Sequence, residues 1–383
     1  MKRALAALAI VALVSTMAMA AEEGAASKPT TTAVSTSTSS PASAPGGKAG
    51  AMQAGQAQVA YPVDDKGNLD SAKFQAAVEE AYQKALAQYG QGTPKIILVM
   101  TTLPPGQAKA IGFVHQKFGR GAPMYGMGNG SYTVVGYNGF LGEKQLGLTV
   151  LALGGEGIAV QTSVVRGFAM KVKDWELKAE AEKTGAKEED LRNAEIKKHA
   201  DWGKELAQGV KPVAGKTNIF LQYGTQHTPR MTWVHQGTTA VLGKDVYIFG
   251  SAASDFGFVW YKGEIISDAL LGVLISGDLK VSMAGSDSPG EDAAAQAKIP
   301  GIFREKLGTV ISEIGGKPQV LFYSGCVGWR FMLPEQKQVA QELLGGTVPL
   351  FGCFAGGEIG RYATSGKQIA EPGQLMLMGI SAK

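Results

Sequence analysis

The sequence lacks a strong charge of either sign. Among 383 residues, 37 Lys and Arg stand against 33 Asp and Glu, which leaves a formal net charge of only +4. Nucleic-acid-binding domains concentrate basic charge on one face, so this composition argues against nucleic acid as a partner. With 45% hydrophobic and 18% charged residues, the chain can bury a sizeable core and is not a wholly disordered protein.

Residues that hold metals and cofactors are scarce and badly spaced. The four histidines form no His-x-x-x-His pair, and the two cysteines are far apart in the chain. Residues 126–130 and 209–217 are glycine-rich but lack the spacing of dinucleotide and phosphate loops, and no Gly-x-Ser-x-Gly elbow occurs. We expect neither a metal nor a cofactor. His227 and His235 could line a cleft, although polar surface or hydrogen-bonded core positions are commoner for histidine.

After residue 20 the sequence has no uninterrupted apolar run long enough to cross a bilayer. Residues 1–20 combine the basic pair Lys2 and Arg3 with an apolar stretch and a small-residue cleavage site that ends at Ala20. We interpret them as a signal peptide cleaved after Ala20, which predicts a periplasmic or secreted protein without stable membrane insertion. Residues 21–60, dominated by Ala, Gly, Ser, Thr and Pro, are predicted to form a disordered linker.

Glycine is abundant, with 52 residues, and it marks an internal repeat. Three apolar strands, at 96–100, 219–223 and 320–324, are each followed at a nearly constant spacing by an aromatic residue and a glycine. These pairs are Tyr125-Gly126, Phe249-Gly250 and Phe351-Gly352, and a third apolar run follows each of them. The pattern predicts an α/β fold with mixed, largely parallel sheets flanked by helices, built from three related strand-crossover-strand-turn-strand units.

Between the first two repeats, residues 166–216 are rich in charges of both signs. The spacing of opposite charges predicts a long helix or a helical pair. Its charged surface is either a solvated face or an arm that docks a partner.

The two cysteines, Cys326 and Cys353, each lie just after a strand of the third repeat. In an exported protein an even number of cysteines favours a disulfide, and we expect one between them. The alternative is a reactive thiol in a ligand pocket.

Several segments together resemble one family. Residues 348–360 are similar to the Pro-x-x-Gly-x-x-x-x-Gly-Glu-Ile-Gly signature of the C-terminal part of FIST domains, and residues 249–255 resemble the central glycine turn of that family. The resemblance extends from about Lys95 to Lys383. It divides the chain into a FIST N-like region at 61–315, with the charged segment 166–216 as a helical insert, and a FIST C-like region at 316–383.

The resemblance implies a sensory module for signal transduction that binds a small ligand, with an amino acid as one option. Arg330 would hold a carboxylate, and Asp255 and Glu358 would bind an ammonium group. The other residues predicted around the ligand are Ser251, Cys326, Gly352 and Gly357. Glu358 could instead accept backbone N–H groups or pair with Arg330. The chain departs from the family by its signal peptide and by one extra residue between Cys326 and Arg330.

The sequence thus predicts an exported FIST-like sensory protein that binds a small polar metabolite without turnover and is not expected to be an enzyme. The sequence does not identify the protein partner. Two alternatives stay open. One is an exported enzyme that uses Cys326, or the carboxylates of Asp255 and Glu358 as acid and base. The other is an interaction scaffold that docks partners through residues 166–216.

Overall fold

The computed structural model describes most of the chain after residue 51. The described residues are 52–61, 69–103, 105–128, 134–136, 139–140, 147–168, 177–225, 230–253, 257–290, 292–330, 332–361, 368–369 and 374–383. The predicted signal peptide lies outside them. None of the helices within these ranges is long and apolar enough to cross a bilayer.

Three six-stranded sheets share one strand order. The first sheet contains, in spatial order, β1 (Gln53–Ala60), β6 (Gly147–Gly154), β2 (Ile96–Thr101), β3 (Met124–Gly128), β10 (Phe258–Tyr261) and β11 (Glu264–Ile266). The second contains β7 (Ala159–Arg166), β12 (Ala269–Gly277), β8 (Thr217–Gly224), β9 (Val246–Ala252), β16 (Gly357–Arg361) and β17 (Gln368–Ile369). The third contains β13 (Leu279–Ser286), β18 (Leu375–Ala382), β14 (Val320–Cys326), β15 (Leu350–Ala355), β4 (Val134–Gly136) and β5 (Gly139–Phe140).

The predicted α/β fold of three related repeats is confirmed. In each sheet the two central strands, β2–β3, β8–β9 or β14–β15, run parallel. The other described pairings are antiparallel, so the sheets are mixed and contain fewer parallel pairs than the crossovers suggested.

Each repeat is longer than the sequence pattern indicated, because it begins with a further strand and helix. The helices of the three repeats are α2 (Ser71–Tyr89) and α3 (Pro105–Phe118), α5 (Glu188–Gln208) and α6 (Arg230–Leu242), and α8 (Ile299–Ile314) and α9 (Leu333–Leu344). The described residues contain three further short helices: α4 (Leu177–Thr184), α7 (Ala293–Gln296) and the 3-10 helix η2 (Val327–Arg330).

These helices and strands correct two boundaries. The predicted linker at 21–60 is wrong for residues 53–60, which form β1 and pair along their whole length with β6. The charged segment 166–216 contains α4 and α5, and α5 occupies the same place in its repeat as α2 and α8. It is therefore part of the repeat rather than an insert, and only α4 is added.

The repeats exchange hairpins in a closed cycle. The hairpin β10–β11 of the second repeat completes the first sheet, and β16–β17 of the third repeat completes the second sheet. The hairpin β4–β5 of the first repeat pairs with β15 and completes the third sheet. Each sheet therefore depends on another repeat for its edge.

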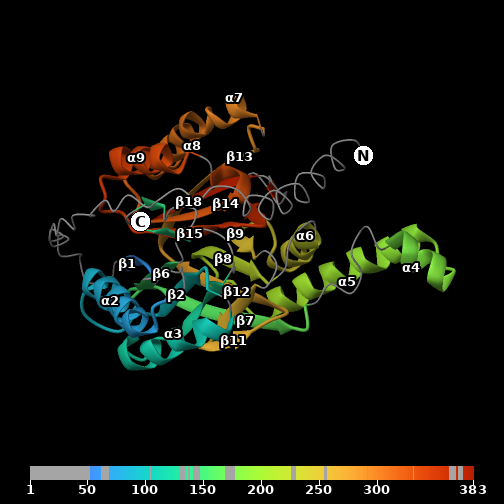
Figure 1. Ribbon diagram of the computed structural model, residues 1–383, viewed down its shortest axis with the longest axis horizontal. Helices are drawn as coiled ribbons and strands as arrows, with labels where there is room; N and C mark the ends of the chain where they lie inside the picture. The colour runs from blue at the N-terminus through green and yellow to red at the C-terminus, as the bar shows by residue number, and fades with distance from the viewer. Residues whose placement is uncertain are drawn as a thin grey trace, which may run out of the picture. The chain divides into compact units, whose positions relative to one another are not determined.

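The hydrophobic core has one central part and three outer parts. Inward-facing side chains of all three sheets form a single buried cluster, which includes Leu98, Leu221 and Phe322. On its outer face each sheet packs against helices of its own repeat: α2 and α3, α5 and α6, or α8 and α9 (Figure 1). The apolar strands predicted from the sequence are buried on both faces, as sheets covered in this way require.

The repeated aromatic-glycine pair has a steric cause. A Cβ atom at Gly126, Gly250 or Gly352 would lie 1.8, 1.7 or 1.8 Å from the carbonyl oxygen of the neighbouring parallel strand. No side chain is compatible with such an approach, so each repeat needs glycine at this position.

We therefore predict that Gly250→Ala lowers the free energy of unfolding by at least about 2 kcal/mol, because the added methyl group forces β8 and β9 apart. Urea unfolding followed by circular dichroism measures the change. The matched control is Gly308→Ala in α8, where a Cβ atom would meet nothing within 4 Å. There the loss of glycine should raise the free energy of unfolding by about 0.5 to 1 kcal/mol. Equal effects of the two substitutions would contradict the steric explanation.

Candidate functional site

One layer of the central core differs between the sheets. In each sheet the parallel register sets a residue of the first central strand beside a residue of the second at the same height, and the hairpin strand adds a third. In the first sheet these residues are Met100, Met127 and Val259, all buried in the central cluster. In the second sheet they are Tyr223, Ser251 and Glu358, and in the third sheet Ser324 and Cys353 occupy the two strand positions. We call Tyr223, Ser251, Glu358, Ser324 and Cys353 the polar layer.

The two serines of the polar layer join the second sheet to the third. Their hydroxyl oxygens lie 2.7 Å apart in a buried hydrogen bond. Because Ser251 and Ser324 are 1% and 0% exposed, each hydroxyl needs this partner to offset the loss of water.

Glu358 is fully buried at 0% exposure. Its Oε2 accepts a hydrogen bond from the backbone N–H of Gln374 at 3.2 Å. The carbonyl oxygen of Gln374 in turn accepts the backbone N–H of Cys326 at 2.8 Å. One peptide group on each side of Gln374 thus connects the buried carboxylate to the cysteine at the end of β14.

The same position is built differently in the other repeats. Thr102 in the first repeat and Thr225 in the second are the counterparts of Cys326 at the end of the first central strand. In each repeat the backbone N–H of this residue donates to the backbone carbonyl oxygen of the residue at the start of the last strand. In the first two repeats the threonine hydroxyl also accepts the N–H of that residue, Gly147 at 2.8 Å or Ala269 at 3.0 Å. In the third repeat Glu358 takes over this acceptor role, and a half-buried cysteine replaces the threonine.

The electrostatics place the acidic groups close together. Burial, and then the charges of Glu358, Cys326 and Cys353, raise the pKa of Tyr323 well above its ordinary value. Burial, with a smaller contribution from Cys353, also raises the pKa of Tyr223. Both phenols therefore stay protonated at neutral pH and beyond. The carboxylate and both thiols act on one phenol, so they belong to one region of the molecule.

The structure brings together part of the predicted site. Ser251, Cys326 and Glu358 lie in or beside the polar layer, and Glu358 accepts a backbone N–H, as one of the alternatives held. Asp255 and His227 lie outside the described residues, as does the side chain of Arg330. Gly352 serves the close approach to Tyr323 described above, and Gly357 begins β16.

Sequence reasoning missed Tyr223 and Ser324. Both stand in runs that are otherwise apolar, and for this reason they were assigned to strands of the core. The register with Ser251 and Cys353 is the signal that marks them, and it becomes visible only when the repeats are aligned strand by strand.

The predicted disulfide is wrong, because Cys326 and Cys353 form no disulfide in the part of the chain that the structure describes. The register pairs Cys353 with Ser324, whereas Cys326 pairs with Ala355, two residues further along. Cys353 belongs to the central cluster, and Cys326 packs against the cluster on the outer face of the third sheet. The two thiols therefore contact different parts of the core.

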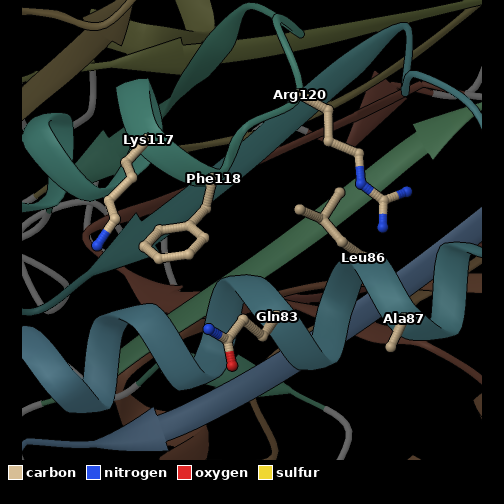
Figure 2. Close-up of a pocket in the computed structure, with 6 residues that line it drawn as sticks. All are labelled: Gln83, Leu86, Ala87, Lys117, Phe118 and Arg120. Atoms are coloured by element: carbon tan, nitrogen blue, oxygen red, sulfur yellow. The ribbon is translucent and has the colours of Figure 1, made fainter.

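No metal site was found in the described part of the chain, where no three His, Cys, Asp or Glu side chains are grouped to hold an ion. An open hollow of about 340 Å³ lies between α2 and the end of α3. Figure 2 shows Phe118 and Arg120 pointing toward α2 there. Arg120 donates to the carbonyl oxygens of Gly90 and Gly92, and Lys117 lies 3.7 Å from Glu79. Because these cations already bind the protein, we take the polar layer as the candidate site.

Among known proteins, similarity to this chain was found only in solved structures. No protein-family model and no curated protein sequence matches the chain. A cyanuric acid hydrolase, described as an evolutionary innovation by structural concatenation, is 11% identical with a TM-score of 0.34 and covers 86% of this chain and 100% of its own. The cyanuric acid hydrolase from A. caulinodans is 8% identical with a TM-score of 0.35 and covers 87% of this chain and 99% of its own.

These neighbours correct the expected function. Both are hydrolases, whereas the sequence predicted a protein that binds without turnover and is not an enzyme. Those two predictions are contradicted. The identities and TM-scores are too low to transfer a substrate or a residue, so the chemistry must be argued from the residues of this chain.

A buried histidine lies on the outer side of the second sheet. His235 of α6 is 0% exposed, and neither ring nitrogen has a hydrogen-bond partner in the described part of the chain. Burial, and then the positive charge of Arg361, lower its pKa from 6.5 to about 4. The ring is therefore neutral in the folded protein at neutral pH.

We predict that His235 makes the protein acid-sensitive. As the pH falls from 6.5 to 4, the unfolded chain takes up a proton at this ring and the folded protein does not, so the free energy of unfolding falls by about 3 kcal/mol. His235→Phe should remove this part of the pH dependence and leave stability at pH 7 equal or higher. Urea unfolding at several pH values tests this, with Trp233→Phe as the control in the same helix. An unchanged pH dependence in His235→Phe would refute the assignment.

Proposed function

We propose that this protein is an enzyme that hydrolyses a small ester or amide, with Cys326 as nucleophile and Glu358 as general base and acid. The observation that carries the proposal is the replacement in the third repeat alone. Where Thr102 and Thr225 bind the start of the last strand, this repeat has a thiol, and a buried carboxylate does the binding instead.

The position suits a nucleophile. Cys326 is partly exposed at the carboxyl end of β14, the edge of a sheet at which ligands of α/β proteins bind. The next turn, η2, is fixed because Gln336 of α9 donates to the carbonyl oxygen of Trp329 at 2.6 Å. Trp329 and Gln336 are both 0% exposed, so the turn that follows Cys326 is anchored to α9.

The chemistry runs in two steps. The sulfur of Cys326 attacks the carbonyl carbon as its proton passes to the carboxylate of Glu358; the bond to the alcohol or amine breaks, and Glu358 returns the proton to that leaving group. Water, deprotonated by Glu358, then attacks the thioester carbon. The carbon–sulfur bond breaks, the thiol recovers a proton, and a carboxylic acid leaves.

As part of the same proposal, the predicted signal peptide at residues 1–20 supports a reaction in the periplasm or outside the cell. An exported thiol must avoid oxidation. The separation of Cys326 from Cys353, which lies in the central cluster at 1% exposure, keeps the two thiols from pairing. A relation to FIST domains remains a proposal on the sequence resemblance.

We predict that the purified protein hydrolyses p-nitrophenyl acetate faster than glutathione does at the same pH and thiol concentration. Cys326→Thr, which installs the residue of the other two repeats, should keep the fold and lose roughly 10³-fold in rate. Glu358→Gln should lose roughly 10²-fold. Release of p-nitrophenol measures the rate, and peptide mass spectrometry locates the acetyl group on Cys326.

The matched control carries Cys326→Thr together with Thr102→Cys. It moves the thiol to the equivalent place in the first repeat, which has no carboxylate in the role of Glu358. This variant should stay inactive. An unchanged rate in Cys326→Thr, or recovery of the rate in the double variant, would show that the proposal is wrong.

A further inference from the structure

We infer that Gln374 is a positioning residue for the proposed reaction: its side chain, tied to Asp287, holds in place the backbone N–H that binds the carboxylate of Glu358. This inference rests on the proposed function and assigns the start of β18 a part in it. It is drawn from three observations: the contacts of Gln374, the register of three adjacent strands, and the residues that the other two repeats have at the same places.

Gln374 joins three groups around the candidate site. Its backbone N–H donates to Oε2 of Glu358 at 3.2 Å, and its carbonyl oxygen accepts the backbone N–H of Cys326 at 2.8 Å. Its side-chain Nε2 donates to Oδ1 of Asp287 at 2.8 Å. Gln374 is only 7% exposed, and hydrogen bonds to a carboxylate are strong where water is excluded. Gln374 is therefore held both at its backbone and at its side chain.

Asp287, Gln374 and Cys326 stand in one row across the third sheet. β18 pairs antiparallel with β13 on one side and with β14 on the other, and both ladders end at Leu375. The next residue of each strand continues the row. Adjacent strands lie about 5 Å apart, so the Cα atom of Asp287 is about 10 Å from that of Cys326, with Gln374 between them. Gln374 thus links the exposed Asp287 to the strand end that carries the thiol.

Among the described strands, the third repeat alone has this link. In the same register the first repeat has Ala60 beside Gly147, and the second has Arg166 beside Ala269. Neither glycine nor alanine has a polar side chain, so this hydrogen bond cannot form in those repeats. The third repeat is also the one in which the carboxylate of Glu358, rather than a threonine hydroxyl, accepts the N–H of the last strand.

The bond between Gln374 and Asp287 supplies a restraint that this exchange of acceptor removes. In the first two repeats one threonine makes two contacts with the start of the last strand, since its N–H donates and its hydroxyl accepts. In the third repeat the acceptor comes from another strand, β16, and the side-chain bond is the additional tie. A general base must stay within about 0.5 Å of its working geometry, and hydrogen bonds of supporting residues hold it there.

The test measures the hydrolysis of p-nitrophenyl acetate by Gln374→Ala, which installs the residue of the second repeat. We expect kcat/KM to fall by roughly 10-fold, because a displaced base transfers the proton less well. Asp287→Ala should cause the same loss, and the double variant should lose no more than either single variant, since both substitutions break one bond. Asp287→Asn keeps an acceptor oxygen for Nε2 and should retain at least about half of the rate.

A second comparison shows whether Gln374 acts through Glu358. In the Glu358→Gln background, Gln374→Ala should change the remaining rate by less than about 2-fold, because no base is left to position. A residue that only stabilised the fold would lower the rate by the same factor in both backgrounds.

Gln319→Ala is the matched control at the other end of β18. The side-chain Oε1 of Gln319 accepts the backbone N–H of Ala382 at 2.7 Å. It therefore ties the same strand, but about 27 Å from Gln374 along the chain. This variant should lower the melting temperature as Gln374→Ala does and keep the rate of the unchanged protein. A 10-fold loss of rate in Gln319→Ala would refute the inference.

The results separate this inference from the proposed function. If hydrolysis depends on Cys326 and Glu358, but Gln374→Ala reacts as fast as the unchanged protein or loses the same factor in both backgrounds, the role of Gln374 is refuted and the proposed function stands. If Asp287→Asn loses as much as Asp287→Ala, the side-chain bond is not the restraint and the inference is refuted. If hydrolysis does not depend on Cys326, the proposed function and this inference fall together.

Discussion

The exchange of hairpins between the three repeats is the constraint on which the rest of the structure depends. A sheet of this protein has an unpaired edge until a strand of another repeat arrives, and exposed edges are prone to unwanted pairing. Because the cycle closes, the described repeats satisfy one another. The exchange also builds the candidate site: Glu358 belongs to the third repeat but stands in the second sheet, and its strand carries it back to Gln374 beside β18. The position of the Glu358 carboxylate therefore depends on both the second and the third repeat.

The three repeats have the same architecture but have divided the tasks. At the height of the polar layer, the first sheet keeps methionines and valine, and the other two sheets carry hydroxyls, a thiol and a carboxylate. At the end of the first central strand, two repeats have a threonine whose hydroxyl accepts a backbone N–H from the start of the last strand, and the third repeat has a cysteine. Repetition made this possible, because a role held three times can be given up once without loss of the fold. The asymmetry lies in side chains, and the strand order stays the same.

Features of this structure that depend on neighbouring residues in the sequence could be predicted, and features that depend on distant residues could not. The aromatic-glycine pairs were visible because the close approach of two parallel strands forces glycine at one position in every repeat. β1 was mistaken for linker because its residues, Gln53–Ala60, contain few β-branched or aromatic side chains. It is a strand because β6 pairs with it and because Gly55 fits against α2, where a Cβ atom would lie 2.0 Å from the carbonyl oxygen of Ala85. The hairpin exchange joins residues far apart in sequence, so no local pattern could indicate it. For the same reason Ser251 and Glu358 were recognised without their partners Ser324 and Gln374.

The polar layer lowers the stability of the protein relative to an apolar layer at the same position. Burying a hydroxyl or a carboxylate in an apolar core is unfavourable unless hydrogen bonds replace the lost water. The serines satisfy each other, and Glu358 receives a backbone N–H, but the hydroxyl of Tyr223 receives nothing from the described residues. The first sheet shows that an all-apolar solution fits the same backbone position. A core shaped by stability alone would have used that solution three times. The polar groups are instead concentrated at one height, in the second and third sheets alone among the described strands.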